Sequence, residues 1–160
     1  MSKTSLAIAI EEDSEPEISL RLWLRLIRCT NQIETHLAAM LKCDFDAGLA
    51  RFDILAALER KRAGMTMSEL AEALLVTNGN VTGRMQTLLR DGLVEIQKDE
   101  SDRRVSIASL TPKGIRTFKK MAESHHAWVR EIFEPLTNED QAALYADLGK
   151  LREALKSSIG

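Results

Sequence analysis

The chain has 160 residues and a formal net charge of −2, with 44% apolar and 29% charged residues, which predicts one mostly helical domain with a core rather than a disulfide scaffold. No apolar run is long enough to cross a bilayer and the N-terminus lacks the pattern of a signal peptide, so we expect a cytoplasmic protein without a membrane partner. Because the charge balance is slightly acidic, any contact with a nucleic acid must come from local basic patches.

The first part of the chain predicts an arm followed by one long helix. Residues 1–16 join an apolar stretch to an acidic run, which is typical of an N-terminal arm or tail. From Glu17 to about Lys42 the apolar residues recur with a helical period but occupy more than one side of the helix. Because such a helix must be covered on several sides, we expect residues 17–48 to form a dimerisation helix.

The middle of the chain predicts a helix-turn-helix. A helix is expected over residues 49–60, and the capping-box pattern of Thr66 and Glu69 opens a short helix over residues 68–75. Turn-forming residues then separate this helix from another over residues 78–90. Two short helices joined by a tight turn make a helix-turn-helix.

A β-hairpin is predicted directly after the second of these helices. Residues 93–98 alternate between apolar and polar side chains, as a half-buried strand does. Residues 99–102 form a charged turn, and residues 103–110 are expected to be the return strand. A hairpin in this position is a wing.

Two further helices are predicted at the C-terminal end. The first begins at the Thr111-Pro112 pair, an N-cap hydroxyl followed by proline at the first helical position, and the second is capped by Thr137 and Asp140. The leucines of the second helix follow a heptad spacing: Leu144, Leu148, Leu151 and Leu155. Since such a seam requires a partner helix, we expect residues 112–160 to be C-terminal dimerisation helices of a homodimer.

The helix over residues 78–90 has the side chains of a DNA-reading element. Its apolar residues cluster within about 100°, and the opposite face holds small and hydrogen-bonding residues but no acid. In a major groove, Asn and Gln can pair with adenine and Arg with guanine. The candidate DNA-binding residues of this recognition helix are Thr77, Asn78, Gly79, Asn80, Thr82, Gly83, Arg84, Gln86, Thr87 and Arg90.

The predicted wing adds a second candidate DNA contact. Arg103 and Arg104 follow Asp102 near the hairpin turn, and an arginine there can enter the narrow, electronegative minor groove. Asp102 is expected to orient one arginine while the other projects toward DNA. The sequence leaves open which arginine has which role.

The order and spacing of several motifs resemble the MarR family of transcription regulators. The motifs are Arg51–Leu55, Met65–Ala71, Gly79–Gly83, Gly92–Val94, Asp102–Arg104 and Leu110–Gly114. The resemblance spans residues 18–157 and implies a mostly α fold with a small β-hairpin wing. In that fold a winged helix-turn-helix, residues 49–111, is flanked by N- and C-terminal dimerisation helices. It also implies that the dimer binds a palindromic operator in double-stranded DNA.

Two departures from the family pattern concern phosphate contacts. The family often has a basic residue where this chain has Thr87, and an arginine where it has Ile96. Both changes remove a potential contact with the DNA backbone. Binding would then depend more on Arg84 and Arg90.

A narrower resemblance concerns the effector. The segments Leu22–Thr30 and His126–Trp128 are similar to family members that control the breakdown of hydroxycinnamic and other aromatic acids and that sense acyl-CoA thioesters. This implies a ligand-responsive repressor that a small aromatic acid or its CoA thioester releases from DNA. The candidate ligand residues, chosen as an aromatic wall with groups that can meet an anion, are Trp23, Arg28, Phe45, Arg51 and His126.

Other classes of site have little support in the sequence. The chain lacks a phosphate-binding loop, a Gly-x-Ser-x-Gly elbow and a His-Glu-x-x-His motif, so we expect no enzyme activity, no catalytic residues and no cofactor. His125 and His126 point about 100° apart on a helix, so no metal site is expected. Cys29 and Cys43 would lie about 21 Å apart on one helix, too far for a disulfide within a chain, although a redox bridge between subunits stays open. The alternative function is a winged-helix protein interaction module, because the fold alone does not determine function.

Overall fold

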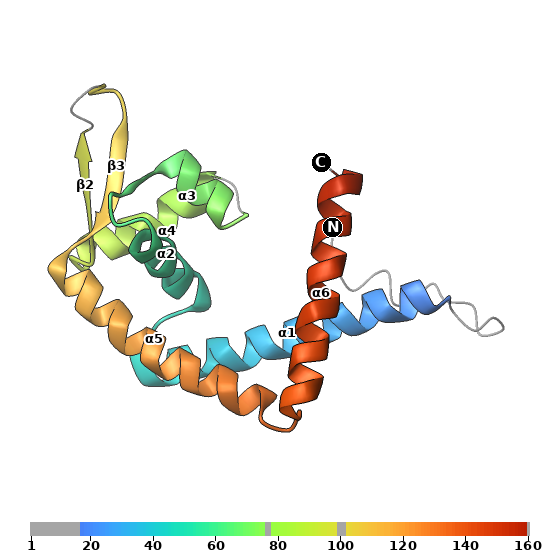
Figure 1. Cartoon of the computed structure of the whole chain (residues 1–160). Helices are drawn as coiled ribbons and strands as arrows, with labels where there is room; N and C mark the ends of the chain where they lie inside the picture. Colours follow the sequence, from blue (N-terminus) through green and yellow to red (C-terminus); the bar gives the residue numbers. More distant parts are fainter. Residues whose placement is uncertain (1–16, 76–77, 99–101, 160) are drawn as a thin grey trace. The chain divides into compact units, whose positions relative to one another are not determined.

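The computed structural model describes residues 17–75, 78–98 and 102–159. The elements of these residues are α1 (Ile18–Phe45), α2 (Leu49–Arg60), β1 (Met65–Thr66), α3 (Met67–Ala73), α4 (Asn78–Arg90), β2 (Val94–Lys98), β3 (Ser106–Leu110), α5 (Pro112–Phe133) and α6 (Asn138–Ile159) (Figure 1). The chain divides after His36 into two compact units, each of which is described by itself. The arm predicted for residues 1–16 and the candidate residue Thr77 lie outside the described residues.

The first unit contains the N-terminal part of α1. None of residues 17–36 is buried, and the side chains of Ile18, Leu22 and Trp23 are all at least half exposed. The helix continues into the second unit, where Leu37 and Leu41 are its first buried residues. The broad apolar surface predicted for this helix is therefore present, and none of the described residues of its own unit, 17–36, covers it.

Helix α1 ends later than the sequence predicted, at Phe45 instead of near Lys42. Asp46 adopts a left-handed φ of 50°, and the amide of Ala47 donates to the carbonyl of Leu41 at 3.2 Å. This arrangement satisfies a free carbonyl at the helix end and turns the chain toward α2.

The core of the second unit lies where α2, α3, α4 and α5 meet the sheet. The largest fully buried side chains are Leu41, Ile54, Leu55, Leu58, Leu70, Val81, Met85, Leu88 and Met121. They come from five helices, and the expected apolar face of the recognition helix is among them. The position of α4 is therefore set by packing on its inner side.

The wing belongs to a three-stranded antiparallel sheet of order β1-β3-β2. The predicted hairpin is confirmed, with Val94 opposite Leu110 and Lys98 opposite Ser106. The additional strand β1 was not predicted, because two residues are too short to show a period. It pairs Met65 with Ala108 and so attaches the wing to the start of α3.

The return strand begins at Ser106, so the prediction that it starts at Arg103 was wrong. The carboxylate of Asp102 accepts a hydrogen bond from the backbone amide of Arg104, and the carbonyl of Asp102 accepts one from the amide of Val105. An Asp side chain that bonds to the backbone two residues on favours a turn over a strand. Both wing arginines therefore lie in the turn.

The capping box at the start of α3 is confirmed. The Glu69 amide donates to the Thr66 hydroxyl at 3.2 Å, and the Thr66 amide donates to the Glu69 carboxylate at 2.8 Å. The helix ends at Ala73, two residues before the predicted end, because Leu75 has a left-handed φ of 54°. A residue in the left-handed conformation cannot continue a right-handed helix.

A tight junction joins the end of α4 to the start of α5. The Thr111 side chain donates to the carbonyl of Gly92 at 2.7 Å and accepts from the amide of Gly114 at 3.0 Å. A Cβ atom placed on Gly114 would lie 2.0 Å from the carbonyl oxygen of Leu93. Only glycine allows the first turn of α5 to approach the backbone this closely.

We predict that Gly114→Ala lowers the free energy of unfolding by about 3 kcal/mol, because the added methyl group must displace backbone atoms. Chemical denaturation measures the change. Gly149→Ala is the matched control, because a Cβ atom at Gly149 meets nothing within 4 Å. That helical control should gain about 0.5 to 1 kcal/mol. Equal stability of Gly114→Ala and the wild type would contradict the close packing of this junction.

Candidate nucleic-acid interface

Helix α4 presents one buried and one exposed face. Val81, Met85 and Leu88 are at most 2% exposed. The predicted DNA-reading residues Gly79, Thr82, Gly83, Arg84, Gln86 and Arg90 are exposed, and Thr87 is half-buried. Asn78 and Asn80 lie in the first turn of α4, where the structure describes the backbone only. The exposed face therefore has hydrogen-bonding groups and two arginines but no acid.

Gly83 has no packing role that would explain a glycine in the middle of α4. A Cβ atom at this position would meet nothing within 4 Å. Glycine in an exposed helix interior nevertheless costs about 1 kcal/mol relative to alanine. Its backbone is accordingly open to close approach by another molecule.

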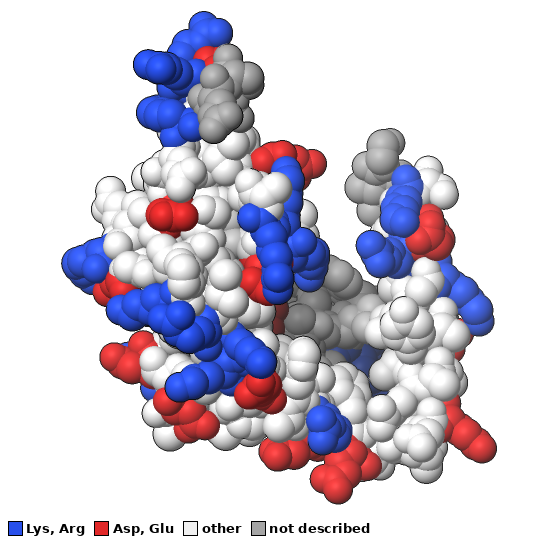
Figure 2. Space-filling model, turned by 60° about the vertical axis from the view of Figure 1, so that its left-hand side comes forward, with Lys and Arg blue, Asp and Glu red and all other residues white. Residues whose placement is uncertain are grey.

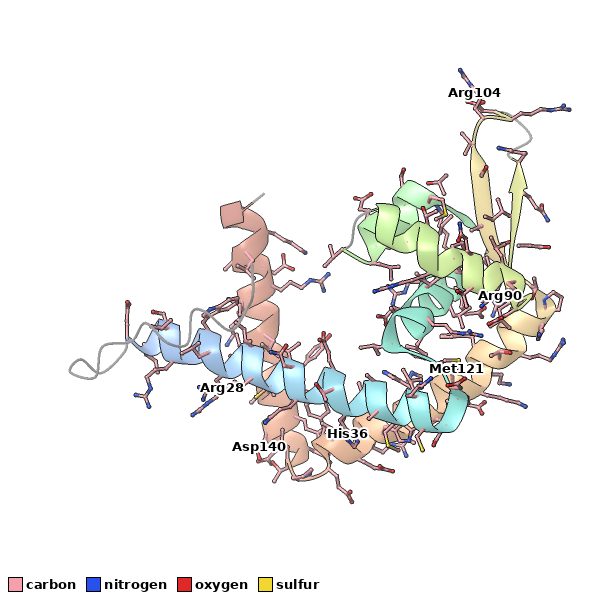
Figure 3. The ribbon with its side chains drawn as sticks, turned by 180° about the vertical axis from the view of Figure 1, so that it is seen from behind. Arg28, His36, Arg90, Arg104, Met121 and Asp140 are labelled. Carbon is pink, nitrogen blue, oxygen red and sulfur yellow. The ribbon has the colours of Figure 1, made fainter. Side chains whose placement is uncertain are left out.

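The wing tip orients one of its two arginines. The Arg104 guanidinium donates to both carboxylate oxygens of Asp102, at 3.1 and 3.3 Å, so Arg104 is the arginine that Asp102 holds. Figure 3 shows Arg104 at the end of the hairpin farthest from α5. Arg103 is exposed, and it has no ion pair among the residues that the structure describes.

Helix α5 carries basic residues that the sequence reasoning missed. No acid occurs between Pro112 and Ala122, and the basic side chains of this stretch are all exposed: Lys113, Arg116, Lys119 and Lys120. In Figure 2, Lys and Arg side chains gather below the wing over this part of α5. Lys113 donates to the carbonyl of Asp91 at 2.8 Å, so this row of basic residues begins beside the end of α4. The absence of acidic residues from this stretch was the feature of the sequence that could have predicted a basic surface on α5.

Comparison with known proteins identifies the family. A family model described as the MarR family matches residues 46–105. The HTH-type transcriptional regulator BilQ of Clostridium symbiosum is 34% identical over 97 residues, which are 59% of this chain and 67% of that protein. The transcriptional activatory protein BadR of Rhodopseudomonas palustris is 30% identical over 127 residues, 77% of this chain and 71% of that protein. The chain belongs to the MarR family.

A solved structure agrees with this assignment. Sco3205, a MarR family transcriptional regulator from Streptomyces coelicolor in complex with DNA, superposes with a TM-score of 0.77 and 25% identity. The superposition covers 94% of this chain and 96% of that one. The fold is therefore the MarR winged helix-turn-helix, and the chain is a transcriptional regulator of the DNA-binding type rather than an enzyme.

The five predicted ligand residues are distributed over both units of this MarR protein. Trp23 and Arg28 are exposed on the N-terminal part of α1. In the second unit, the rings of Phe45 and Trp128 meet edge to face with their centroids 6.2 Å apart, and His126 is exposed. Arg51 donates to the Asp91 carboxylate at 2.6 Å. Its guanidinium is therefore already engaged with an anion of the protein itself.

Two grooves of the second unit do not include any predicted ligand residue. One, of about 540 Å³, lies where α5 turns into α6 and is lined by Val129, Phe133 and Leu136 among others. The other, of about 460 Å³, lies between α2 and α3 and is lined by Asp53 and Arg60 among others. The described residues contain no cluster of three or more potential metal ligands and no helix long and apolar enough to cross a membrane.

An aromatic cluster joins α2 to α5. The ring of Phe52 stacks on His125 at 4.5 Å between centroids and contacts Phe118 at 5.6 Å. Burial in this cluster lowers the pKa of His125, and the neighbouring His126 lowers it further. The neutral imidazole is accordingly the form that fits between the two helices.

We predict that His125 makes the protein less stable in mild acid. Its pKa is lower in the folded chain than the ordinary value of 6.5. This contribution to stability is fully present above pH 6.5 and is lost as the pH falls toward the folded value, because the unfolded chain binds the proton first. Thermal melts between pH 5 and 8 should show less pH dependence for His125→Phe than for the wild type. Identical profiles would contradict the assignment.

Proposed function

We propose that this protein is a homodimeric, sequence-specific regulator that reads a palindromic operator with α4 and contacts the flanking minor groove with its wing. The observation that carries the proposal is the acid-free exposed face of α4, with Arg84, Gln86 and Arg90, placed beside a hairpin that ends in two arginines. Asn78 and Asn80 of the same helix remain proposed contacts, as does Thr77, which precedes the helix in the chain. Operator DNA would place the protein in the cytoplasm.

The distribution of charge supports a nucleic-acid partner for the winged helix. Residues 49–120 contain 13 Lys and Arg against 9 Asp and Glu, whereas the rest of the chain contains 9 against 15. The positive excess is thus confined to the segment that carries α4 and the wing. A local positive excess attracts phosphates even when the whole chain is slightly acidic.

The uncovered apolar surfaces support a dimer. On α6 the leucines of the heptad seam are each more than one third exposed: Leu144, Leu148, Leu151 and Leu155. Leu22 and Trp23 of α1 are likewise about half exposed. Large apolar side chains that are exposed along one helix in this way support an interface. A two-fold dimer would present its two recognition helices roughly 34 Å apart, one turn of DNA.

We expect Arg103→Ala and Gln86→Ala to weaken DNA binding in different ways. Arg103→Ala removes about one phosphate or minor-groove contact, which should lower the salt slope of binding by about 1 and cost about 1 to 3 kcal/mol. Gln86→Ala should leave the salt slope unchanged and relax the preference at one or two base pairs. Fluorescence anisotropy at two salt concentrations distinguishes these outcomes. The probes are the palindrome that the wild type selects from a randomised library and a scrambled duplex of equal length.

The control variant is Arg62→Ala, which removes an exposed arginine that follows α2 and pairs with Glu59 of that helix. It should bind as the wild type does. Light scattering must show that each variant is a dimer of twice the 17.9 kDa chain. A stable monomer would contradict the dimer. If Arg103→Ala and Arg104→Ala both bind as the wild type does, the wing does not contact DNA and an interaction module is the better description.

The finer part of the proposal is a repressor that a small aromatic acid or its CoA thioester releases from DNA. It is supported by the edge-to-face contact of the Phe45 and Trp128 rings, and the exposed His126 remains a proposed polar contact. Trp23 and Arg28 remain proposed contacts, whereas Arg51 would first have to leave Asp91. The effector must bind the DNA-incompetent state more tightly, and a 150-fold effect requires about 3 kcal/mol of coupling.

We expect at least one aromatic acid or thioester to raise the melting temperature of the dimer and to weaken operator binding. Each is screened beside its saturated-ring counterpart, such as cyclohexanecarboxylate beside benzoate, because loss of the flat ring should weaken stacking on Phe45 and Trp128. A promoter reporter in cells shows whether control is repression or activation. If no compound changes either quantity, the effector proposal is wrong, while the DNA-binding proposal is unaffected.

A further inference from the structure

The C-terminal end of the recognition helix is attached to α2 by one ion pair. The Arg51 guanidinium donates to the Asp91 carboxylate at 2.6 Å, and the two side chains are 28% and 33% exposed. Arg51 lies in the first turn of α2 and Asp91 directly follows α4, 40 residues later. The pair therefore links two helices that the chain itself connects only through α3 and its turns.

Two hydrogen bonds from the start of α5 also hold this end of α4 in place. The carbonyl of Asp91 accepts a hydrogen bond from Lys113, and the carbonyl of Gly92 accepts one from Thr111. Figure 3 shows Arg90, the last residue of α4, beside the start of α5. Among these contacts, Arg51 supplies the one that comes from α2, so it restrains α4 from a different side.

The length of α4 amplifies any movement at this point. Its 13 residues span roughly 18 Å from end to end. A tilt of about 10° at Asp91 would thus move the first turn of the helix by about 3 Å. Functional groups must stay within roughly 0.5 Å and 10 to 20° of their productive geometry, so base contacts would be lost while phosphate contacts could adapt.

We propose that Arg51 and Asp91 act as positioning residues for sequence reading. Their ion pair fixes the angle of α4 and so determines how well the protein distinguishes its operator from other DNA, without either side chain contacting a base. The pKa of Asp46, in the joint between α1 and α2, is lowered chiefly by its hydrogen bond and charge interaction with Lys42, and Arg51 lowers it to a smaller extent. This inference rests on the proposed DNA-binding function.

A double-mutant cycle tests the proposal with Arg51→Met, Asp91→Asn and the double variant. We expect Arg51→Met to lose about tenfold or more in operator affinity, while its affinity for a scrambled duplex and its salt slope stay as in the wild type. Asp91→Asn should lose as much on the operator, and it also frees Arg90, whose Nε lies 3.9 Å from the Asp91 carboxylate. The double variant should bind no worse than either single one, because the pair is already broken. Anisotropy on the selected palindrome and the scrambled duplex measures both affinities, and thermal melts confirm that the dimers are folded.

Lys61→Met is the matched control. Lys61 forms an ion pair of similar length with Glu69, at 2.7 Å, and that pair does not involve α4. It should keep operator preference. Equal losses on both duplexes, additive losses in the double variant, or wild-type preference in folded variants would each overturn the positioning role. If Arg51→Met does not fold, Arg51→Lys and Asp91→Glu are measured, and they should retain part of the preference. A wild type without operator preference would instead refute the DNA-binding function itself.

Discussion

The approach of the first turn of α5 to the backbone of Leu93 is the constraint on which the winged helix depends. Thr111 bonds to Gly92 and caps α5, and Gly114 leaves room for the Leu93 carbonyl. At this place α4 ends, β2 begins and β3 passes into α5. The recognition helix and the wing therefore have a common support, so a displacement there would move both candidate DNA contacts together.

Elements with a strong local signal could be predicted from the sequence. The apolar period and the cap residues gave α2, α4 and the starts of α3 and α5, because hydrogen bonds at a cap need only residues close in the chain. The wing hairpin was predicted for the same reason. Strand β1 could not be, since its pairing with β3 joins residues about 40 positions apart and two residues show no period. Helix ends at Asp46 and Leu75 were misplaced because no glycine marks either of these left-handed positions in the sequence.

Some features of the candidate site could likewise be predicted from the sequence, whereas others could not. Exposure of Arg84, Gln86 and Arg90 followed from helical geometry and is confirmed. Which wing arginine Asp102 holds depends on side-chain geometry within a turn, and the structure was needed to select Arg104. The pairing of Arg51 with Asp91 was also beyond reach, because nothing in the sequence relates residues 40 positions apart. An arginine selected for its ability to bind an anion proved to have an anion of the protein as its partner.

The ion pair of Arg104 with Asp102 at the wing tip affects how many DNA contacts a salt titration reports. The Arg104 side chain is 91% exposed, so dissolved salt weakens its attraction to Asp102 as it weakens attraction to phosphates. Raising the ionic strength would then loosen the shape of the wing in the free protein as well as release counterions from the complex. The number of phosphates inferred from a salt titration would include this rearrangement, and a chemically crosslinked wing would give a smaller number.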